Sequence, residues 1–248
     1  MSTSSPVAVV TGAAGGIGRA ITARLQRDGW VVVGSDRTEA VPGPDRWVAC
    51  DVTDESSVAD LAAAVAAAYG RVDAVVTCAG VIDVAPVETM TREQWDRVIT
   101  VNLTGTFLSV RAFLPHLRAS SRGRVVCISS DAGKTGEPGI AHYCASKFGV
   151  IGFAQSLALE LAGTGTTVNC VCPVICDTAM MESLAEDFAV AYPDADTATW
   201  RDRFVAEIPL GRACTPDDVA HAVAYLVDEG SSFVTGQAIN VSGGHEVH

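Results

Sequence analysis

The chain has 248 residues, of which 48% are hydrophobic and 19% are charged, so it can bury one large core and is not an intrinsically disordered chain. Its formal net charge of −12 disfavours nucleic-acid partners and anionic membrane surfaces. No apolar run reaches the length of a membrane span, about 18 residues, and residues 1–6 lack the layout of a signal peptide. We therefore expect a cytoplasmic protein.

Strands and helices alternate along the chain without a linker or an internal repeat. Short β-branched runs predict strands at residues 7–11, 30–35, 46–50, 73–78, 124–129, 167–172 and 237–241. Helical periodicity predicts helices at residues 16–28, 53–69, 91–120, 143–161 and 215–228. Continuous apolar strands joined by helices indicate a parallel sheet covered on both faces. We expect a single domain over residues 1–248 with a doubly wound, Rossmann-like α/β fold of about seven strands.

Residues 179–210 depart from this alternation. Met181, Leu184 and Phe188 recur at helical spacing, as do Trp200 and Phe204, and a turn at residues 192–194 separates the two groups. These features predict a pair of amphipathic helices. The pair is either a surface hairpin or a lid over a functional site.

The eight cysteines predict buried thiols and no metal site. Most lie inside apolar runs, without the regular framework of a secreted miniprotein. Cys170, Cys172 and Cys176 are close in sequence, but the first two lie two apart on a predicted strand and no histidine lies close by.

A glycine-rich turn after the first predicted strand indicates a dinucleotide site. Gly12, Gly16 and Gly18 have the spacing G-x-x-x-G-x-G, and Gly15 and Ile17 complete the turn, which opens the first helix. Such a turn allows backbone to approach a pyrophosphate and directs a helix N-terminus at it. A tight turn without a ligand is the alternative.

Two acidic residues end the next two predicted strands. Asp36 can accept both ribose hydroxyls of an adenosine and would repel a 2′-phosphate, which favours NAD over NADP. Arg37 is the basic residue that could bind that phosphate instead. Asp51 can accept from an adenine amino group beside Val52, or it can simply be an acid at a helix N-terminus.

Tyr143 and Lys147 lie four residues apart, so a phenol and an ammonium share one face of the predicted helix. Ser130 ends a predicted strand 13 residues before this tyrosine, and Asn102 lies in the preceding helical stretch. Taken alone, a tyrosine and a lysine at this spacing can equally be two residues on a helix surface without a function. Its meaning depends on the other motifs.

Together these features closely resemble the short-chain dehydrogenases/reductases, in the branch of about 250 residues with a Y-x-x-x-K site. The resemblance covers residues 7–245 and includes Asp51-Val52, Cys78-Ala79-Gly80, Val101-Asn102, Ile128-Ser129-Ser130 and the closing Gly236-Gln237 and Gly243-Gly244. It implies a cofactor site that adds Ala79, Gly80, Pro173 and Thr178 to the residues above. It also implies a homotetramer.

Carried over from the family, Tyr143 is the general acid/base, Ser130 hydrogen-bonds the reacting oxygen, and Lys147 holds the nicotinamide ribose and lowers the tyrosine pKa. Asn102 would hold a water of a proton relay. The chemistry is consistent with this, because an adjacent ammonium and an oxidised nicotinamide both favour a phenolate. Thr178 would touch the nicotinamide, so the segment 179–210 that follows it is expected to be a substrate lid.

The sequence departs from the family pattern at two positions. Cys78 stands where the family usually has the second asparagine of N-N-A-G, which weakens a tie between strands. Val174 stands where the family usually has a glycine after Pro173, which alters the backbone beside the nicotinamide.

We expect an NAD-dependent oxidoreductase that interconverts a secondary alcohol and a ketone. The alternatives are a 3-oxoacyl-thioester reductase of the same family and a dinucleotide-sensing protein without turnover. Asp131, Glu137 and His142 are expected to border the substrate; carboxylates disfavour an anion and accept from hydroxyl groups, which favours a small neutral alcohol, polyol or hydroxyketone. Arg201, Arg203 and Arg212 are the groups that could instead receive an anion.

Overall fold

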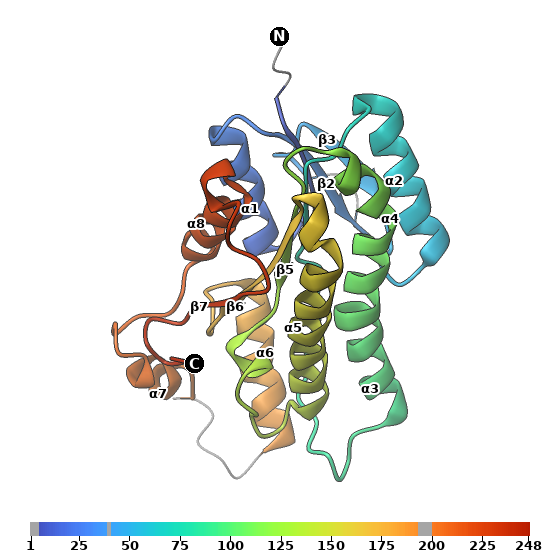
Figure 1. Ribbon diagram of the computed structural model, residues 1–248. Coiled ribbons are helices and arrows are strands. Elements are labelled where there is room, and N and C mark those ends of the chain that lie inside the picture. Colours follow the sequence, from blue (N-terminus) through green and yellow to red (C-terminus); the bar gives the residue numbers. More distant parts are fainter. Residues whose placement is uncertain (1–4, 39–40, 193–199) are drawn as a thin grey trace.

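A computed structural model describes residues 5–38, 41–192 and 200–248. Its centre is one parallel sheet of seven strands in the order β3-β2-β1-β4-β5-β6-β7 (Figure 1). The strands are β1 (Val7–Thr11), β2 (Val31–Asp36), β3 (Arg46–Ala49), β4 (Ala74–Thr77), β5 (Arg124–Ile128), β6 (Thr167–Pro173) and β7 (Ala238–Val241). The predicted fold class is confirmed.

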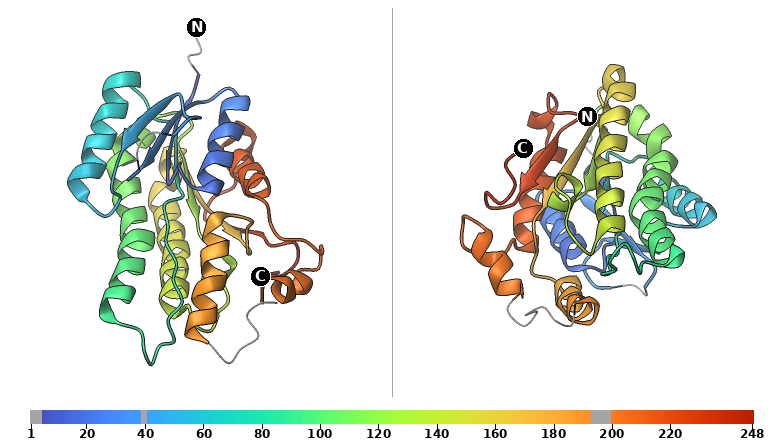
Figure 2. Two further views of the ribbon diagram at one scale, coloured as in Figure 1. Left: turned by 180° about the vertical axis from the view of Figure 1, so that it is seen from behind. Right: turned by 90° about the horizontal axis from the view of Figure 1, so that it is seen from below.

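Helices cover both faces of the sheet (Figure 2). One face packs against α1 (Gly16–Arg27) and α8 (Pro216–Val227), and the other packs against α2 (Glu55–Tyr69), α4 (Gly105–Ala119) and α5 (Ala141–Leu161). The remaining helices are α3 (Arg92–Ile99), α6 (Ala179–Ala191) and α7 (Trp200–Glu207).

Successive residues of a strand contribute their side chains alternately to the cores on the two faces of the sheet. Val9, in the middle of β1, belongs to the core under α2, α4 and α5, whereas Val10 belongs to the core under α1 and α8. Successive strand side chains point to opposite faces, so a strand buried on both sides is apolar throughout. All five residues of β1 and of β5 are buried, and apart from Thr11 and Arg124 they are apolar.

The strand order creates the site. β1 pairs with β2 on one side and with β4 on the other, so the chain direction across the sheet reverses there. In open α/β sheets, ligands bind at such a point, outside the carboxyl ends of the strands. The segments after β1 and β4 therefore meet at one edge of the sheet.

The helix predicted over residues 91–120 is interrupted. A five-residue π-helical turn at Thr100–Thr104 lies between α3 and α4 and carries Asn102. Its side chain is buried and hydrogen-bonds to the backbone of Val81. Such turns are rare and are frequent at functional sites, and hydrophobic periodicity alone does not reveal them.

The same stretch, Arg92–Ala119, is long and apolar enough to cross a membrane by length and composition, the one such stretch in the described part of the chain. Here it forms core helices, with Phe113 and Leu117 fully buried and α4 packed against α2. The apolarity of this stretch reflects its packing against the sheet and against α2.

Candidate active site

A cavity of about 430 Å³ lies along the carboxyl edge of the sheet. The cofactor residues predicted from the sequence all line it: Gly12, Gly15, Gly16, Ile17, Gly18, Asp36, Arg37, Asp51, Val52, Ala79, Gly80, Tyr143, Lys147, Pro173 and Thr178. Of the predicted catalytic residues, Ser130, Tyr143 and Lys147 line the cavity and Asn102 does not. The structure thus brings a nucleotide-binding half and a reactive half into one space.

Two positions of the glycine turn, Gly12 and Gly18, leave no room for a side chain. Gly12 has a φ of +68°, and a Cβ on it would lie 2.6 Å from the backbone nitrogen of Ala79. A Cβ on Gly18 would lie 2.2 Å from the carbonyl oxygen of Gly12, closer than any real contact. No side chain caps the N-terminus of α1, so its first N–H groups stay available to an anion. The turn fits a pyrophosphate.

Three charged side chains line the nucleotide-binding half of the cavity. The carboxylate of Asp36 accepts a hydrogen bond from the backbone N–H of Ala14 in the glycine turn, at 3.3 Å. Arg37 is largely exposed, and its Nη1 lies 3.9 Å from Oδ2 of Asp51. Asp51 also accepts from the backbone and the hydroxyl of Thr53. An adenosine bound here would meet Asp36, Arg37 and Asp51 together.

Both departures from the family pattern are accommodated. The hydroxyl oxygen of Thr11 accepts from the backbone N–H groups of Cys78 and Ala79, which ties β1 to the segment after β4. Val174 is buried, and its backbone N–H donates to the carbonyl of Val241. In the described ranges no residue other than glycine has a positive φ, so Val174 adopts an ordinary backbone conformation.

Tyr143, in the first turn of α5, faces the cavity beside Ser130, which follows β5. Desolvation raises the pKa of the Tyr143 phenol well above its usual value, and a hydrogen bond with Ser130 opposes this shift. The ammonium of Lys147 lies 5.5 Å from the centre of the Tyr143 ring and donates to the carbonyl of Ile128 at 2.9 Å. Lys147 is 5% exposed, and burial lowers its pKa.

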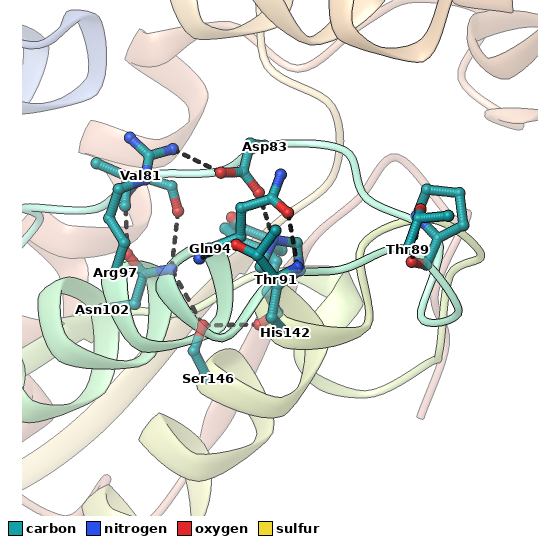
Figure 3. A network of polar contacts seen from close by, with 11 residues as sticks. Val81, Asp83, Thr89, Thr91, Gln94, Arg97, Asn102, His142 and Ser146 are labelled. Carbon is teal, nitrogen blue, oxygen red and sulfur yellow. Dashed lines mark hydrogen bonds and ion pairs between the residues drawn. The ribbon is translucent and has the colours of Figure 1, made fainter. Parts of the chain in front are cut away.

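The side-chain amide of Asn102 hydrogen-bonds to the backbone of Val81 and to the hydroxyl of Ser146 (Figure 3). Its Oδ1 accepts from the N–H of Val81 at 2.8 Å, and its Nδ2 donates to the carbonyl of Val81 at 2.9 Å and to Oγ of Ser146 at 3.0 Å. Ser146 in turn donates to the carbonyl of Tyr143 at 2.7 Å. Both N–H groups of the amide are thus used within the chain, and the relay water that Asn102 would hold remains a prediction. The hydrogen bonds of Asn102 and Ser146 connect the β4 loop to α5.

The expectation that His142 faces the pocket does not hold. Its side chain is fully buried, its Nε2 contacts the carboxylate of Asp83, and it does not line the cavity (Figure 3). The carboxylate of Asp83 also forms an ion pair with Arg97, with 2.9 Å between Oδ2 and Nη2. Adjacent helix residues point about 100° apart, so with Tyr143 facing the cavity, His142 turns toward the β4 loop.

Asp131 and Glu137 do line the cavity, on the loop between Ser130 and α5. Asp131 is 9% exposed and Glu137 is half-buried, and burial raises the pKa of both carboxyl groups. Sequence reasoning missed the partner of Asp131: Nδ1 of His245 lies 3.5 Å from its Oδ2. The two residues are far apart in the chain, and no local spacing signals their contact.

An apolar wall closes the reactive half of the cavity. Met181, Leu184 and Phe188 of α6 line it, as their spacing suggests, and Phe204 of α7 joins them. Leu184 and Phe188 pack, with Ile82 and Tyr143, against a buried cluster that consists of Val84, Ala132, Ile140 and Cys144. Residues 193–194 of the expected turn lie outside the described residues, as does the side chain of Trp200.

Comparisons with known proteins agree with this geometry. A family model described as enoyl-(acyl carrier protein) reductase matches residues 12–246. A putative ketoacyl reductase of monensin polyketide synthesis from Streptomyces virginiae is 40% identical over 97% of both chains. A diacetyl reductase ((S)-acetoin forming) of Staphylococcus aureus is 34% identical over 98% of both. A crystal structure of a single-residue variant of actinorhodin polyketide ketoreductase with NADPH superposes with a TM-score of 0.91, at 38% identity over 97% of both.

The fold and the cavity are those of an oxidoreductase that uses a nicotinamide dinucleotide. The chain belongs to the short-chain dehydrogenase/reductase family.

Proposed function

We propose that this protein interconverts a secondary alcohol and a ketone, uses NAD, and acts on a small neutral alcohol, polyol or hydroxyketone. The observation that carries this proposal is the meeting of Ser130, Tyr143 and Lys147 in one cavity with the glycine turn. A dinucleotide-sensing protein without turnover has no need of this set of groups.

In this proposal Tyr143 gives a proton to the ketone oxygen or takes one from the alcohol. Bound nicotinamide supplies or accepts the hydride. Lys147, which lies beside the phenol ring and Gly80, holds the nicotinamide ribose and favours ionisation of the phenol by its charge. Ser130 hydrogen-bonds the reacting oxygen. Asn102 keeps the β4 loop and the first turn of α5 in register through Val81 and Ser146.

The choice of NAD rests on Asp36. Its carboxylate is tied to the glycine turn, where it accepts ribose hydroxyls and repels a 2′-phosphate. Arg37 opposes this choice; its guanidinium is largely exposed and lies 3.9 Å from the carboxylate of Asp51, which competes with a phosphate for its charge.

A neutral substrate fits the charges around the reactive half. Glu137 and Asp131 make an anion costly there. Arg201 pairs with Asp177, and Arg212 pairs with Asp218 at 2.6 Å, so these guanidiniums are occupied by carboxylates of the chain itself. All eight cysteines are free thiols, which suits a reducing cytoplasm.

A second candidate is reduction of a 3-oxoacyl thioester. The family model and the ketoacyl reductase relative favour it, and the apolar wall of α6 can pack against an acyl chain. Both candidates share Tyr143 and the same hydride chemistry, so they differ in what surrounds the ketone.

A substrate comparison tests the proposal. Oxidation of NADH is followed by absorbance with cyclohexanone, with acetoin and with the N-acetylcysteamine thioester of 3-oxobutanoate. We expect cyclohexanone and acetoin to have a higher kcat/KM than the thioester. A thioester preferred by more than tenfold would establish the second candidate instead. If NADH binds but none of the ketones causes its oxidation, the protein is a dinucleotide sensor.

We also propose that residues 179–210 act as a lid and that the protein is a homotetramer. The lid is supported by the α6 side chains over the cavity. The assembly is supported by exposed apolar side chains on α4 and α5, where Phe107, Phe148 and Leu159 are 39%, 46% and 82% exposed.

A further inference from the structure

Two cysteines lie opposite each other beside the cavity. Cys176, shortly after β6, and Cys214, shortly before α8, form an isolated parallel β-bridge. The backbone N–H of Cys214 donates to the carbonyl of Ile175 at 3.1 Å, and the N–H of Asp177 donates to the carbonyl of Cys214 at 3.0 Å. Residues paired in this way have Cα atoms about 4.8 Å apart, and a disulfide spans about 4.4–6.8 Å. The backbone therefore has the spacing of a disulfide.

The two thiols also contact each other. Both side chains are buried in the core under α1 and α8. The hydrogen bond between the thiols lowers the pKa of Cys214 and raises the pKa of Cys176. The pair therefore loses its first proton at Cys214, and the remaining hydrogen lies between the two sulfurs. Transfer of this hydrogen to Cys214 leaves a thiolate, the nucleophilic form, at Cys176.

Cys176 lines the cavity, and Cys214 lies behind it. A second pair of opposed cysteines lacks this access. Cys127 and Cys170 are register partners on β5 and β6, and their thiols share a hydrogen bond. Both are fully buried, and neither lines the cavity. The two pairs thus share the same arrangement and differ in access from the cavity.

Both cysteine segments contact the glycine turn. A Cβ on Gly16 would lie 2.9 Å from Cγ2 of Thr178 and 3.9 Å from Cγ of Pro216. Thr178 follows Cys176 by two residues, and Pro216 follows Cys214 by two residues. The helix that Pro216 begins, α8, packs beside α1, which the glycine turn opens (Figure 1). A disulfide brings the Cβ atoms to about 3.8 Å, so its formation moves these two segments relative to the turn.

We propose that Cys176 and Cys214 are a redox-active dithiol, which a peroxide that enters the cavity oxidises to a disulfide, and that this disulfide weakens binding of the dinucleotide. The inference goes beyond the proposed function, because the oxidation does not depend on which ketone the protein reduces. It assigns a modification site to two residues that have no part in the hydride chemistry.

The oxidation takes place in two steps. The Cys176 thiolate attacks one oxygen of hydrogen peroxide, the O–O bond breaks, and the departing hydroxide takes up the thiol proton as water, which leaves a sulfenic acid on Cys176. The sulfur of Cys214 then attacks the sulfenic sulfur. The S–S bond forms, the S–O bond breaks, and the second hydroxide leaves with the second thiol proton as water. The two thiols lose two electrons and two protons, and the peroxide is reduced to two waters.

Peptide mapping measures the bond directly. Trypsin cleavage separates the two pairs, since Cys214 falls alone in peptide 213–248, Cys127 falls alone in peptide 125–134, and their partners fall in peptide 148–201. The full chain is treated with hydrogen peroxide without cofactor, and the remaining thiols are alkylated. We expect 213–248 to become linked to 148–201 within one chain, at least about tenfold faster than 125–134 becomes linked. Saturating NAD should slow this link.

Two variants identify the sulfurs. In Cys214→Ser the sulfenic acid has no second thiol, so we expect dimedone to label Cys176. Cys172→Ser is the matched control, because Cys172 is buried in the same peptide and does not line the cavity. This variant should form the link to peptide 213–248 as the wild type does. An unchanged melting temperature excludes a folding defect in either variant.

The effect on the cofactor is measured as the dissociation constant of NADH after the peroxide is removed. We expect the disulfide to raise it about tenfold, within the usual range of coupling between two sites. Dithiothreitol should restore the original value. Cys176→Ser should show no change in NADH affinity on treatment with peroxide.

The inference is overturned if peroxide leaves 213–248 unlinked, if 125–134 becomes linked equally fast, or if the link joins two chains. NADH affinity that is unchanged by the disulfide would overturn its second part. Protection by NADP in place of NAD would support the dithiol and correct the cofactor choice of the proposed function. A protein that forms the disulfide but reduces no ketone would support the dithiol and refute the proposed function.

Discussion

At the scale of single residues, two adjacent side chains at the end of β2 act in opposite directions on cofactor choice. Asp36 repels a 2′-phosphate and Arg37 attracts one. We expect NADH to be preferred over NADPH, and we expect Asp36→Ala to reduce the preference by at least about tenfold, since one such contact contributes about 1.5–3 kcal/mol. The measurement is the ratio of kcat/KM for the two cofactors. Equal or better use of NADPH by the wild type would show that Arg37 prevails.

Glu137 provides a residue-scale prediction about the substrate. Its half-buried carboxylate lines the reactive half of the cavity, and burial raises its pKa. We expect cyclohexanol to have a higher kcat/KM than cis-4-hydroxycyclohexanecarboxylate, because a second carboxylate there is repelled. Glu137→Gln should narrow this gap. Preference of the wild type for the carboxylated alcohol would contradict the neutral-substrate proposal.

Local spacing places Tyr143 and Lys147 on one helix face, whereas their meeting with Ser130 was expected from the resemblance to the family. Tyr143 and Lys147 lie on α5, and Ser130 follows β5 closely, so each is placed by its own element. His142 and His245 are different, because their positions depend on Asp83 and Asp131, which the chain brings in from other segments. Sequence periodicity carries no information on such contacts.

At the scale of elements, α6 covers the reactive half of the cavity. Leu184 lines the cavity, whereas Val190 of the same helix is 82% exposed and lies outside it. We expect Leu184→Ala to raise the KM for cyclohexanone about tenfold through the loss of apolar contact, with the NADH affinity unchanged. Val190→Ala is the matched control and should leave KM unaltered. An unchanged KM in Leu184→Ala would argue for an inert surface helix.

Helices and strands could be predicted where the hydrophobic periodicity was strong. The interruption of a long helix could not be predicted in this way. The stretch 91–120 has helical periodicity throughout, yet the π-helical turn at Thr100–Thr104 divides it. Within that turn the amide of Asn102 hydrogen-bonds to the backbone of Val81, a tertiary contact that periodicity does not reveal. The periodicity of α6, by contrast, identified the side chains that face the cavity.

At the scale of the whole molecule, α4 and α5 present a shared surface. Phe107 and Phe153 contact each other edge to face across these helices, at 6.1 Å between ring centroids, while Phe148 remains 46% exposed. We expect sedimentation at micromolar concentration to give a mass of four chains. Phe148→Glu should reduce this mass, because a charge on a paired helix face is costly to bury. A wild-type mass of one chain would refute the assembly.

The whole account depends on Tyr143 as the acid/base of an oxidoreductase. The most direct measurement is the absorbance of NADH formed from NAD with a panel of secondary alcohols, for the wild type, for Tyr143→Phe and for Tyr225→Phe, whose side chain is 54% exposed and outside the cavity. We predict turnover by the wild type and by Tyr225→Phe, and a loss of about 10³-fold or more in Tyr143→Phe with NADH binding retained. Tyr143→Phe that keeps the wild-type rate would contradict the account.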